Sequence, residues 1–277
     1  LAYEAATADL NDVNMIDPFH LEAYGETTVN YNRDIEIFPV LRTTFERIYG
    51  ENPYKSPTDM GVNMAGNCIC DDEVCRQASL QEIIRRYYDT MDRFISGSCS
   101  EEEVFKLEML MNQAGITVHD RPVVDAALNR AEQTGAPAAA LELPDGRIVT
   151  GKTSDLLGAA AALLLNALKE LAGIAHACHV ISPEAIEPIQ KLKVNYLGSH
   201  NPRLHTDEVL IALSVSAATD RNAQLALEQL PKLNGCQLHT SVMVSPVDIN
   251  IFKKLFIQAT FEPKYEKKTV FQEEKGI

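Results

Sequence analysis

Residues 138–174, AAALELPDGRIVTGKTSDLLGAAAALLLNALKELAGI, decide the fold class of this chain. Pro144, Asp145 and Gly146 form a strong tight-turn signal, because proline presets the first turn dihedral and glycine accepts a positive φ. Apolar and polar residues alternate on both sides of the turn, a pattern that predicts a β-hairpin. Residues 156–165 are all apolar or glycine and predict a helix that is buried on most sides. The hairpin and the helix together predict an α/β fold.

A polar junction precedes this helix. We expect Ser154 to cap the helix by accepting a backbone N–H, with Asp155 favoured by the positive end of the helix dipole. Gly173 is expected to end it. The apolar run is shorter than the roughly 20 residues that span a bilayer, so it predicts a core helix.

The junction also matches a nucleotide-binding pattern. Gly146 and, after four residues, Gly151-Lys152-Thr153 satisfy G-x-x-x-x-G-K-[ST]. The intervening residues include Ile148 and Val149, which favour a strand, so a hairpin leading into a helix is preferred over a phosphate loop. Anions bind readily at helix N-termini. This predicts an anion-binding group of three residues: Lys152, Thr153 and Ser154.

Composition limits the classes of function. The chain has 277 residues, enough for a sizeable core and two domains, and its formal charge is 25 minus 39, or −14. Such an acidic chain is not expected to bind nucleic acid over a broad surface. No segment resembles a signal peptide or a membrane helix, and six cysteines do not make a secreted disulfide framework. We therefore expect a cytoplasmic protein without membrane contact. The start at Leu1, directly in structured-looking sequence, predicts a fragment of a longer chain.

The order of patterns predicts three parts. Residues 1–66 form a polar N-terminal segment, 67–134 a helical subdomain and 135–277 an α/β domain. Apolar residues at helical spacing between 80 and 95 form one face, expected to be core or an oligomer seam. The helical subdomain is therefore expected to join copies of the chain into a homo-oligomer. Further elements are predicted at 39–49 (helix), 101–114 (helix), 122–134 (helix, capped by Asp120), 176–181 (strand), 182–187 (helix broken by Pro188), 222–230 (helix), 237–244 (strand), from Pro246 (helix) and 256–261 (strand).

The polar N-terminal segment offers candidate ligands. Its acidic residues and His20 could bind metal, but turn formation is the usual role of Asn and Asp, and we prefer it. Cys68, Cys70 and Cys75 lack an evident fourth zinc ligand, so no metal or other cofactor is predicted. Dense polar loops favour binding. The predicted cleft wall consists of Asn30, Asn32, Arg33 and Asp59, with His20 as one candidate acid–base residue.

A second polar loop precedes a helix that opens with Thr206. Asn201, Arg203 and His205 place several donors immediately before this helix. Backbone N–H groups, the helix dipole and an arginine fork together favour a phosphate or carboxylate. His205 is the second candidate acid–base residue, because histidine titrates near neutral pH. The alternative is a loop that only caps its helix and bonds its own backbone.

Six runs resemble one family across nearly the whole chain. They are 1–25 (LAYEAATADLNDVNMIDPFHLEAYG), 30–41 (NYNRDIEIFPVL), 54–66 (YKSPTDMGVNMAG), 143–159 (LPDGRIVTGKTSDLLGA), 181–193 (ISPEAIEPIQKLK) and 197–214 (LGSHNPRLHTDEVLIALS). The chain resembles the C-terminal portion of bacterial proteins of the Domain of Unknown Function 1846 family. The resemblance implies a missing upstream nucleotide-binding-like α/β portion, and it assigns no reaction.

The resemblance and the element order also suggest a cytidine-deaminase-like α/β/α sandwich. Zinc deaminases use H-x-E together with P-C-x-x-C. This chain has no P-C-x-x-C, and its H-x-E at residues 20–22 lies outside the element series. A sandwich without the zinc motif is therefore expected, and fold likeness alone does not argue function.

Two functions remain open at this point. The first is an enzyme fragment that binds a small phosphate- or carboxylate-bearing molecule in a cleft between subdomains. The second is a non-catalytic assembly module of a larger nucleotide-binding protein. The sequence leaves open whether the chain is an enzyme at all.

Overall fold

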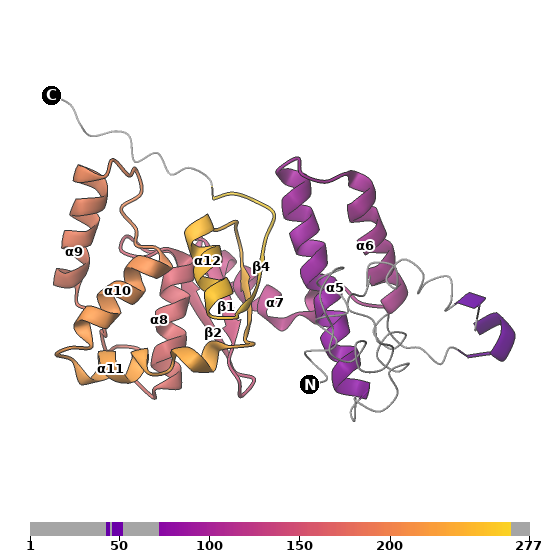
Figure 1. The fold of residues 1–277 in the computed structure, drawn as a ribbon, viewed down its shortest axis with the longest axis horizontal. Coiled ribbons are helices and arrows are strands. Elements are labelled where there is room, and N and C mark those ends of the chain that lie inside the picture. The colour runs from indigo at the N-terminus through magenta and orange to yellow at the C-terminus, as the bar shows by residue number, and fades with distance from the viewer. Residues whose placement is uncertain (1–42, 45, 52–71, 267–277) are drawn as a thin grey trace, which may run out of the picture. The chain divides into compact units, whose positions relative to one another are not determined.

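The computed structural model describes residues 43–44, 46–51 and 72–266 (Figure 1). Contacts divide the chain into two compact units, Leu1–Arg121 and Pro122–Ile277. Within the described ranges, no helix has both the length and the apolar character that crossing a membrane requires. Five predicted site residues lie outside the described residues: His20, Asn30, Asn32, Arg33 and Asp59.

Helices make up the described part of the first unit. α5 (Asp72–Ile95) and α6 (Glu101–Ala114) pack on each other and are followed by the short η1 (Val118–Asp120). α6 ends at Gly115, which adopts a left-handed φ of 68° and bonds back to the last turn. The helix predicted at 101–114 is therefore confirmed. Residues 43–44 and 46–49 are also helical, within the predicted segment 39–49.

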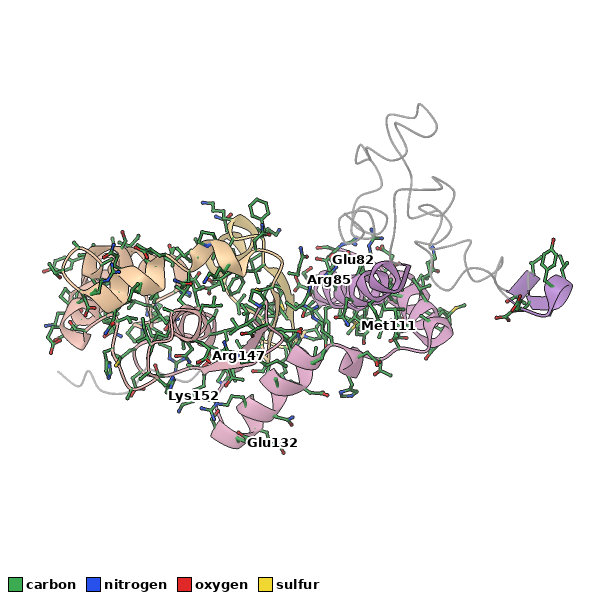
Figure 2. All side chains as sticks on the ribbon, turned by 90° about the horizontal axis from the view of Figure 1, so that it is seen from below. Glu82, Arg85, Met111, Glu132, Arg147 and Lys152 are labelled. Atoms are coloured by element: carbon green, nitrogen blue, oxygen red, sulfur yellow. The ribbon has the colours of Figure 1, made fainter. Side chains whose placement is uncertain are left out.

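A buried ion pair lies on α5. Glu82 is 1% exposed and accepts a hydrogen bond of 2.6 Å from Nε of Arg85, one helical turn away (Figure 2). Burial raises the pKa of Glu82, although the charges of Arg85 and Arg86 oppose this shift. Isolated buried ion pairs contribute little net stability but are costly to break.

The second unit is built on a four-stranded mixed sheet, which confirms the α/β class. The strands are β1 (Ala138–Glu142), β2 (Ile148–Lys152), β3 (Gln237–Thr240) and β4 (Gln258–Phe261), in the order β2-β1-β3-β4. β1 is antiparallel to β2 and β3, whereas β3 is parallel to β4. The predicted hairpin joins β1 and β2, and its Gly146 has a φ of 82° as such a turn requires.

Helices cover both faces of this sheet. Ala140 of β1 packs with Val123 and Ala127 of α7 (Pro122–Thr134), while the neighbouring Ala139 and Leu141 join the core on the side of α8 (Ala159–Leu171). Successive residues of a strand face opposite sides, so β1 is apolar on both. α7 therefore belongs to the sheet unit, whereas the sequence grouped it with the two preceding helices.

The remaining helices pack on the α8 side. Figure 1 shows them grouped around α8, and all of them except η2 (Leu192–Tyr196) place apolar residues in one continuous core with β1 and β3. Their bounds are α9 (Pro183–Lys191), η2 (Leu192–Tyr196, a π-helix), α10 (Thr206–Ser216), α11 (Arg221–Leu227), η3 (Leu230–Leu233) and α12 (Pro246–Lys254).

Several predicted elements were wrong. Residues 176–181 form turns and bends instead of a strand. The backbone N–H of Cys178 donates to the nearby carbonyl of Ala175 and not to a neighbouring strand. Pro188 lies inside α9 and does not end it. A proline within a helix removes one backbone hydrogen bond, a local loss that packing can offset. Ile186 of α9 is buried in the core, which supplies that packing.

The start of α8 and the cap of α7 also differ from the prediction. α8 begins at Ala159 with Gly158 as its N-cap, so Ser154 does not cap it. Asp120 accepts from the backbone N–H of Thr117 and thereby closes the turn η1. Both side chains satisfy a nearby backbone donor, as short polar residues commonly do.

Candidate functional site

Two polar segments that the sequence singled out lie side by side. The backbone N–H of Leu204 donates to the carbonyl of Leu156 at 2.9 Å, and Gly158 N donates to Leu204 O at 3.2 Å. These bonds form a parallel bridge between Leu157 and Leu204. The segment that follows β2 and the segment that precedes α10 are therefore joined by their backbones. This junction follows the carboxyl end of β2 in the chain.

The first segment does not form the helix N-terminus that was predicted. Lys152 is the last residue of β2 and is exposed, whereas Thr153 is buried and its N–H donates to Pro137 O at 2.8 Å. Ser154 Oγ accepts from the N–H groups of Leu156 and Leu157 at 3.3 and 3.1 Å, which forms a turn. The helix begins only after this turn, and the Ser154 hydroxyl is already used within the turn.

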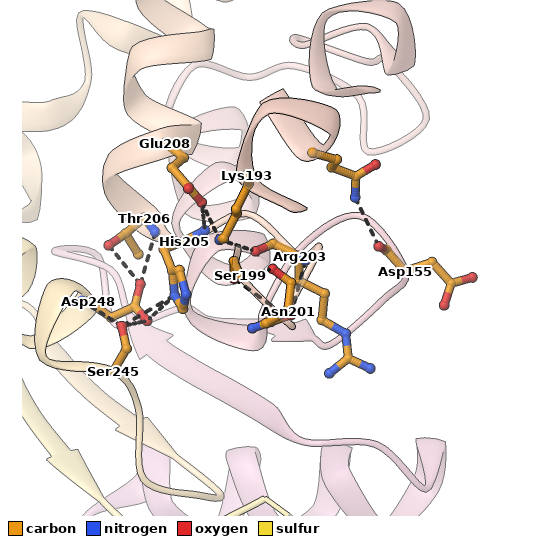
Figure 3. Close-up of polar contacts among 11 residues, drawn as sticks. Asp155, Lys193, Ser199, Asn201, Arg203, His205, Thr206, Glu208, Ser245 and Asp248 are labelled. Carbon is orange, nitrogen blue, oxygen red and sulfur yellow. Dashed lines mark hydrogen bonds and ion pairs between the residues drawn. The ribbon is translucent and has the colours of Figure 1, made fainter. Parts of the chain in front are cut away.

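The second segment, which precedes α10, also forms hydrogen bonds within itself. Oδ1 of Asn201 accepts from the N–H of Arg203 at 3.1 Å, and Asn201 N donates to Ser199 Oγ at 3.2 Å. Nη1 of Arg203 pairs with Oε1 of Glu266 at 2.9 Å. In Figure 3 the Arg203 guanidinium extends away from His205. An anion that binds Arg203 must therefore compete with the Glu266 carboxylate.

His205 and Asp248 form the most developed polar cluster near this junction (Figure 3). His205 is the N-cap residue of α10, and its Nδ1 lies 3.0 Å from Oδ2 of Asp248 in the first turn of α12. Asp248 Oδ1 accepts from both N and Oγ1 of Thr206, each at 2.9 Å. Ser245 Oγ donates to Asp248 Oδ2 at 2.7 Å. Two helix N-termini thus converge on one carboxylate.

These contacts set the charge of the pair. Burial by itself would raise the pKa of Asp248, but the hydrogen bonds from His205, Thr206 and Ser245 outweigh burial and lower it. The hydrogen bond to Asp248 raises the pKa of His205 above its ordinary value, against the opposing effect of burial. Asp248 is therefore an anion that favours the protonated ring.

The second ring nitrogen of His205 is open. Across the part of the chain that the structure describes, Nε2 has no hydrogen-bond partner, and it is not enclosed. The side chain is 27% exposed. With Nδ1 donating to Asp248, a neutral ring presents the lone pair of Nε2 to solvent. This arrangement can accept a proton and return it, which is general acid–base chemistry.

Ser245 does not complete a nucleophilic triad. A triad needs the serine hydroxyl on the ring nitrogen opposite the carboxylate. Here Ser245 Oγ lies 3.3 Å from Nδ1 of His205, the same nitrogen that binds Asp248. In the described ranges, no group of three or more potential ligands is arranged to hold a metal ion. The cluster is suited to proton transfer and not to covalent attack by Ser245.

Sequence reasoning found His205 but missed the residues that hold it. Ser245 and Asp248 have the [ST]-x-x-[DE] spacing of a helix start, a local signal that was available. The contact of His205 with Asp248 spans 43 positions and that with Ser245 spans 40, and neither has a local signature. Lys193 was missed for a similar reason, since its contacts with Arg203 and Glu208 span 10 and 15 positions. Glu208 was missed although it lies only three positions from His205, whose backbone N–H donates to it.

A pH series tests the assigned His205–Asp248 bond. A folded-state pKa above the unfolded value of about 6.5 makes protonated His205 stabilising. This contribution is complete below the unfolded pKa and disappears as pH rises through the folded-state pKa. We expect the advantage of wild type over His205→Gln in urea unfolding to shrink from mildly acidic to alkaline pH. An advantage that is constant or grows with pH would show that Asp248 does not favour the charged ring.

Comparisons with known proteins give the family. The model described as Domain of unknown function DUF1846, C-terminal, matches residues 119–271, and its N-terminal counterpart matches residues 1–115. The chain therefore carries sequence of both domains, which corrects the narrower resemblance to the C-terminal portion alone. The two matches meet close to the division between the two compact units.

Two similar relatives are UPF0371 proteins. One, from Corynebacterium diphtheriae, is 58% identical over 272 residues, which cover 98% of this chain and 55% of that protein. Another, from Streptococcus pyogenes serotype M5, is 58% identical over 266 residues, covering 96% and 54%. The chain spans about half the length of the relatives it matches.

Proposed function

The chain belongs to the DUF1846 family, and from the geometry of its second unit we propose that this part of the protein is enzymatic. Its substrate is a small molecule that bears a phosphate or carboxylate group. His205 transfers a proton through Nε2, and Asp248 orients the ring and stabilises its charged form.

The open Nε2 atom carries this proposal. A helix cap needs only a group that satisfies the first backbone N–H groups, and Asp248 already serves Thr206 in this way. The contact between His205 Nδ1 and Asp248 goes beyond what this cap needs, and a carboxylate with four donors holds the imidazole in one orientation. Holding a titratable ring with one nitrogen open is what proton transfer requires.

Two cations support the anionic class of substrate. Lys152 is exposed, and its ammonium makes no ion pair within the described part of the chain. Arg203 is 15% exposed, and its partner Glu266 is 39% exposed and is the last described residue. A phosphate or carboxylate that replaces Glu266 keeps the charge pairing of Arg203 and frees a solvated glutamate. The backbones of the segments that carry these two cations are joined at Leu157 and Leu204, which supports a shared binding region.

The finer fold and the location are part of the same proposal. A sheet that begins with a hairpin and has helices on both faces supports a cytidine-deaminase-like sandwich without its zinc motif. Cys99, Cys178 and Cys236 are all free thiols, which supports a reducing cytoplasm. No cofactor is proposed.

One observation favours a second function, assembly. Phe105 and Met109 lie one turn apart on α6 and are 58% and 43% exposed. Apolar pairs at this spacing suit a helix–helix contact. On this view the first unit joins copies of the chain and the polar loops are structural.

A thermal-shift panel distinguishes the two functions. We expect sodium phosphate, glucose 6-phosphate or sodium citrate to raise the unfolding midpoint relative to sodium chloride of equal ionic strength. A probe at about 100 times its Kd stabilises the folded state by roughly 2.7 kcal/mol. Arg203→Gln should abolish the shift, and Arg221→Gln, which alters an exposed arginine bonded to Gln224, should preserve it.

Two outcomes of the thermal-shift panel would contradict the proposed anion site. If no probe shifts the midpoint while the protein forms a stable oligomer, assembly replaces catalysis as the better function. If the shift is equal in Arg203→Gln and wild type, the anion binds elsewhere.

A further inference from the structure

Lys193 is buried where its neighbours are not. Its side chain is 9% exposed, yet Leu192 and Val194 on either side are 51% and 39% exposed, and Tyr196 is 80% exposed. This inverts the usual order, in which lysine faces water and large apolar residues are buried. Desolvating an ammonium is costly unless it is paired and hydrogen-bonded. The fold therefore keeps this charge inside for the contacts it makes.

Lys193 lies in a π-helix. In η2 the N–H of Leu197 bonds to the carbonyl of Leu192 at 3.1 Å, five residues back. The wider turn rotates the following side chains relative to an α-helix. Single π-turns occur frequently at functional sites. Figure 3 shows the Lys193 side chain pointing towards the loop that carries His205.

The ammonium of Lys193 holds that loop at two points. Nζ donates to the carbonyl of Arg203 at 2.7 Å and to Oε2 of Glu208 at 2.7 Å. The same Glu208 oxygen accepts from the backbone N–H of His205 at 2.8 Å. Lys193 therefore holds the residues on both sides of Leu204, directly on one side and through Glu208 on the other.

We propose that Lys193 is a positioning residue for His205: it fixes the backbone that carries the ring and neutralises Glu208, so that Asp248 alone governs the proton on His205. The inference rests on the proposed function in treating that proton as the one transferred. The charged groups that face His205 are Asp248, Glu208 and Lys193. Without Lys193, two carboxylates would act on the ring and hold it protonated, which would remove a base near neutral pH.

NMR titration of the His205 ring tests this role without a known substrate. His205→Gln assigns the ring signals. We expect Lys193→Met, which keeps the apolar stem and removes the charge, to raise the pKa of His205, because Glu208 is then uncompensated. Glu208→Gln should lower it, and the double variant should lie between the two. The matched control is Lys191→Met, because Lys191 is 63% exposed and, among the described residues, pairs only with Glu187. The His205 ring in this variant should titrate as in wild type.

Hydrogen exchange of the His205 amide provides a second readout. Losing a charge-assisted hydrogen bond should accelerate this exchange by about tenfold in Lys193→Met. An unchanged ring titration together with an unchanged amide would overturn the positioning role. If Lys193→Met does not fold, the test rests on Glu208→Gln. An unchanged pKa of the His205 ring in Glu208→Gln would also overturn the positioning role of Lys193. These outcomes are independent of the thermal-shift panel, so the inference and the proposed function can fail separately.

Discussion

Replacing Gly151 with alanine is expected to destabilise the second unit by about 3 kcal/mol or more, because backbone cannot move aside as a side chain can. A Cβ at Gly151 would lie 2.5 Å from Cα of Leu163 and closer still to its backbone nitrogen. The C atom of Ala162 would be 2.9 Å away. Only a shift of β2 away from α8 relieves these overlaps. Such a shift opens the main core, and whole domains are stable by only about 5–15 kcal/mol.

Gly158→Ala is the matched control for this substitution. A Cβ there would meet only the carbonyl oxygen of Leu204, at 3.8 Å, and Gly158 has an ordinary φ of −68°. Its loss should stay below about 1 kcal/mol, the difference between glycine and alanine at an N-cap. Urea unfolding followed by circular dichroism gives both values. Equal midpoints for the two variants would mean that β2 and α8 are not packed this closely.

Gly151 also explains why the phosphate-loop pattern misleads. In a true phosphate loop, glycine lets backbone N–H groups approach phosphate. Here Gly151 belongs to β2, and its missing side chain lets a strand approach a helix. The same residue type answers both needs, so the pattern alone cannot separate them. Ile148 and Val149, which favour a strand, were the local signal that separated them correctly.

The sequence predicted those parts of the fold that local chemistry determines. The turn at Gly146, the end of α6 at Gly115 and the start of α12 at Pro246 each depend on a residue whose backbone preference is decisive. Residues 176–181 were mispredicted as a strand. Val180 and Ile181 are buried there, and short apolar runs do not reveal which structure buries them.

Only part of the candidate site could be predicted from local sequence. His205 could be found because a titratable side chain before a helix start is visible in sequence. Whether its ring is held or free depends on Asp248 and, through Glu208, on Lys193, which come from other helices. Their pairing arises from how α12 and α9, with η2 directly after it, pack against α10, which in turn packs on α8. That packing minimises the exposure of the whole core, and no single segment encodes it.

Asp248→Ala is expected to have the second largest effect, a loss of about 3 kcal/mol or more in unfolding free energy. The change removes the acceptor of four hydrogen bonds. Thr206 is fully buried, so its N–H and hydroxyl would lose their acceptor away from water. Each buried unsatisfied donor costs about 1–3 kcal/mol. The matched control is Asp155→Ala, because the exposed Asp155 carboxylate has no partner in the described ranges, and it should stay within about 0.5 kcal/mol of wild type.

The pH dependence of this loss separates a charged contact from simple packing. The folded-state pKa of Asp248 lies below its unfolded value of about 3.9. Its contribution is therefore present above the unfolded pKa and disappears as pH falls through the folded-state value. The gap between wild type and Asp248→Ala should narrow in acid, opposite to the His205 series, which narrows in alkali. If the Asp248 gap is flat with pH, the carboxylate acts only as a neutral acceptor and no longer supports a proton-transferring His205.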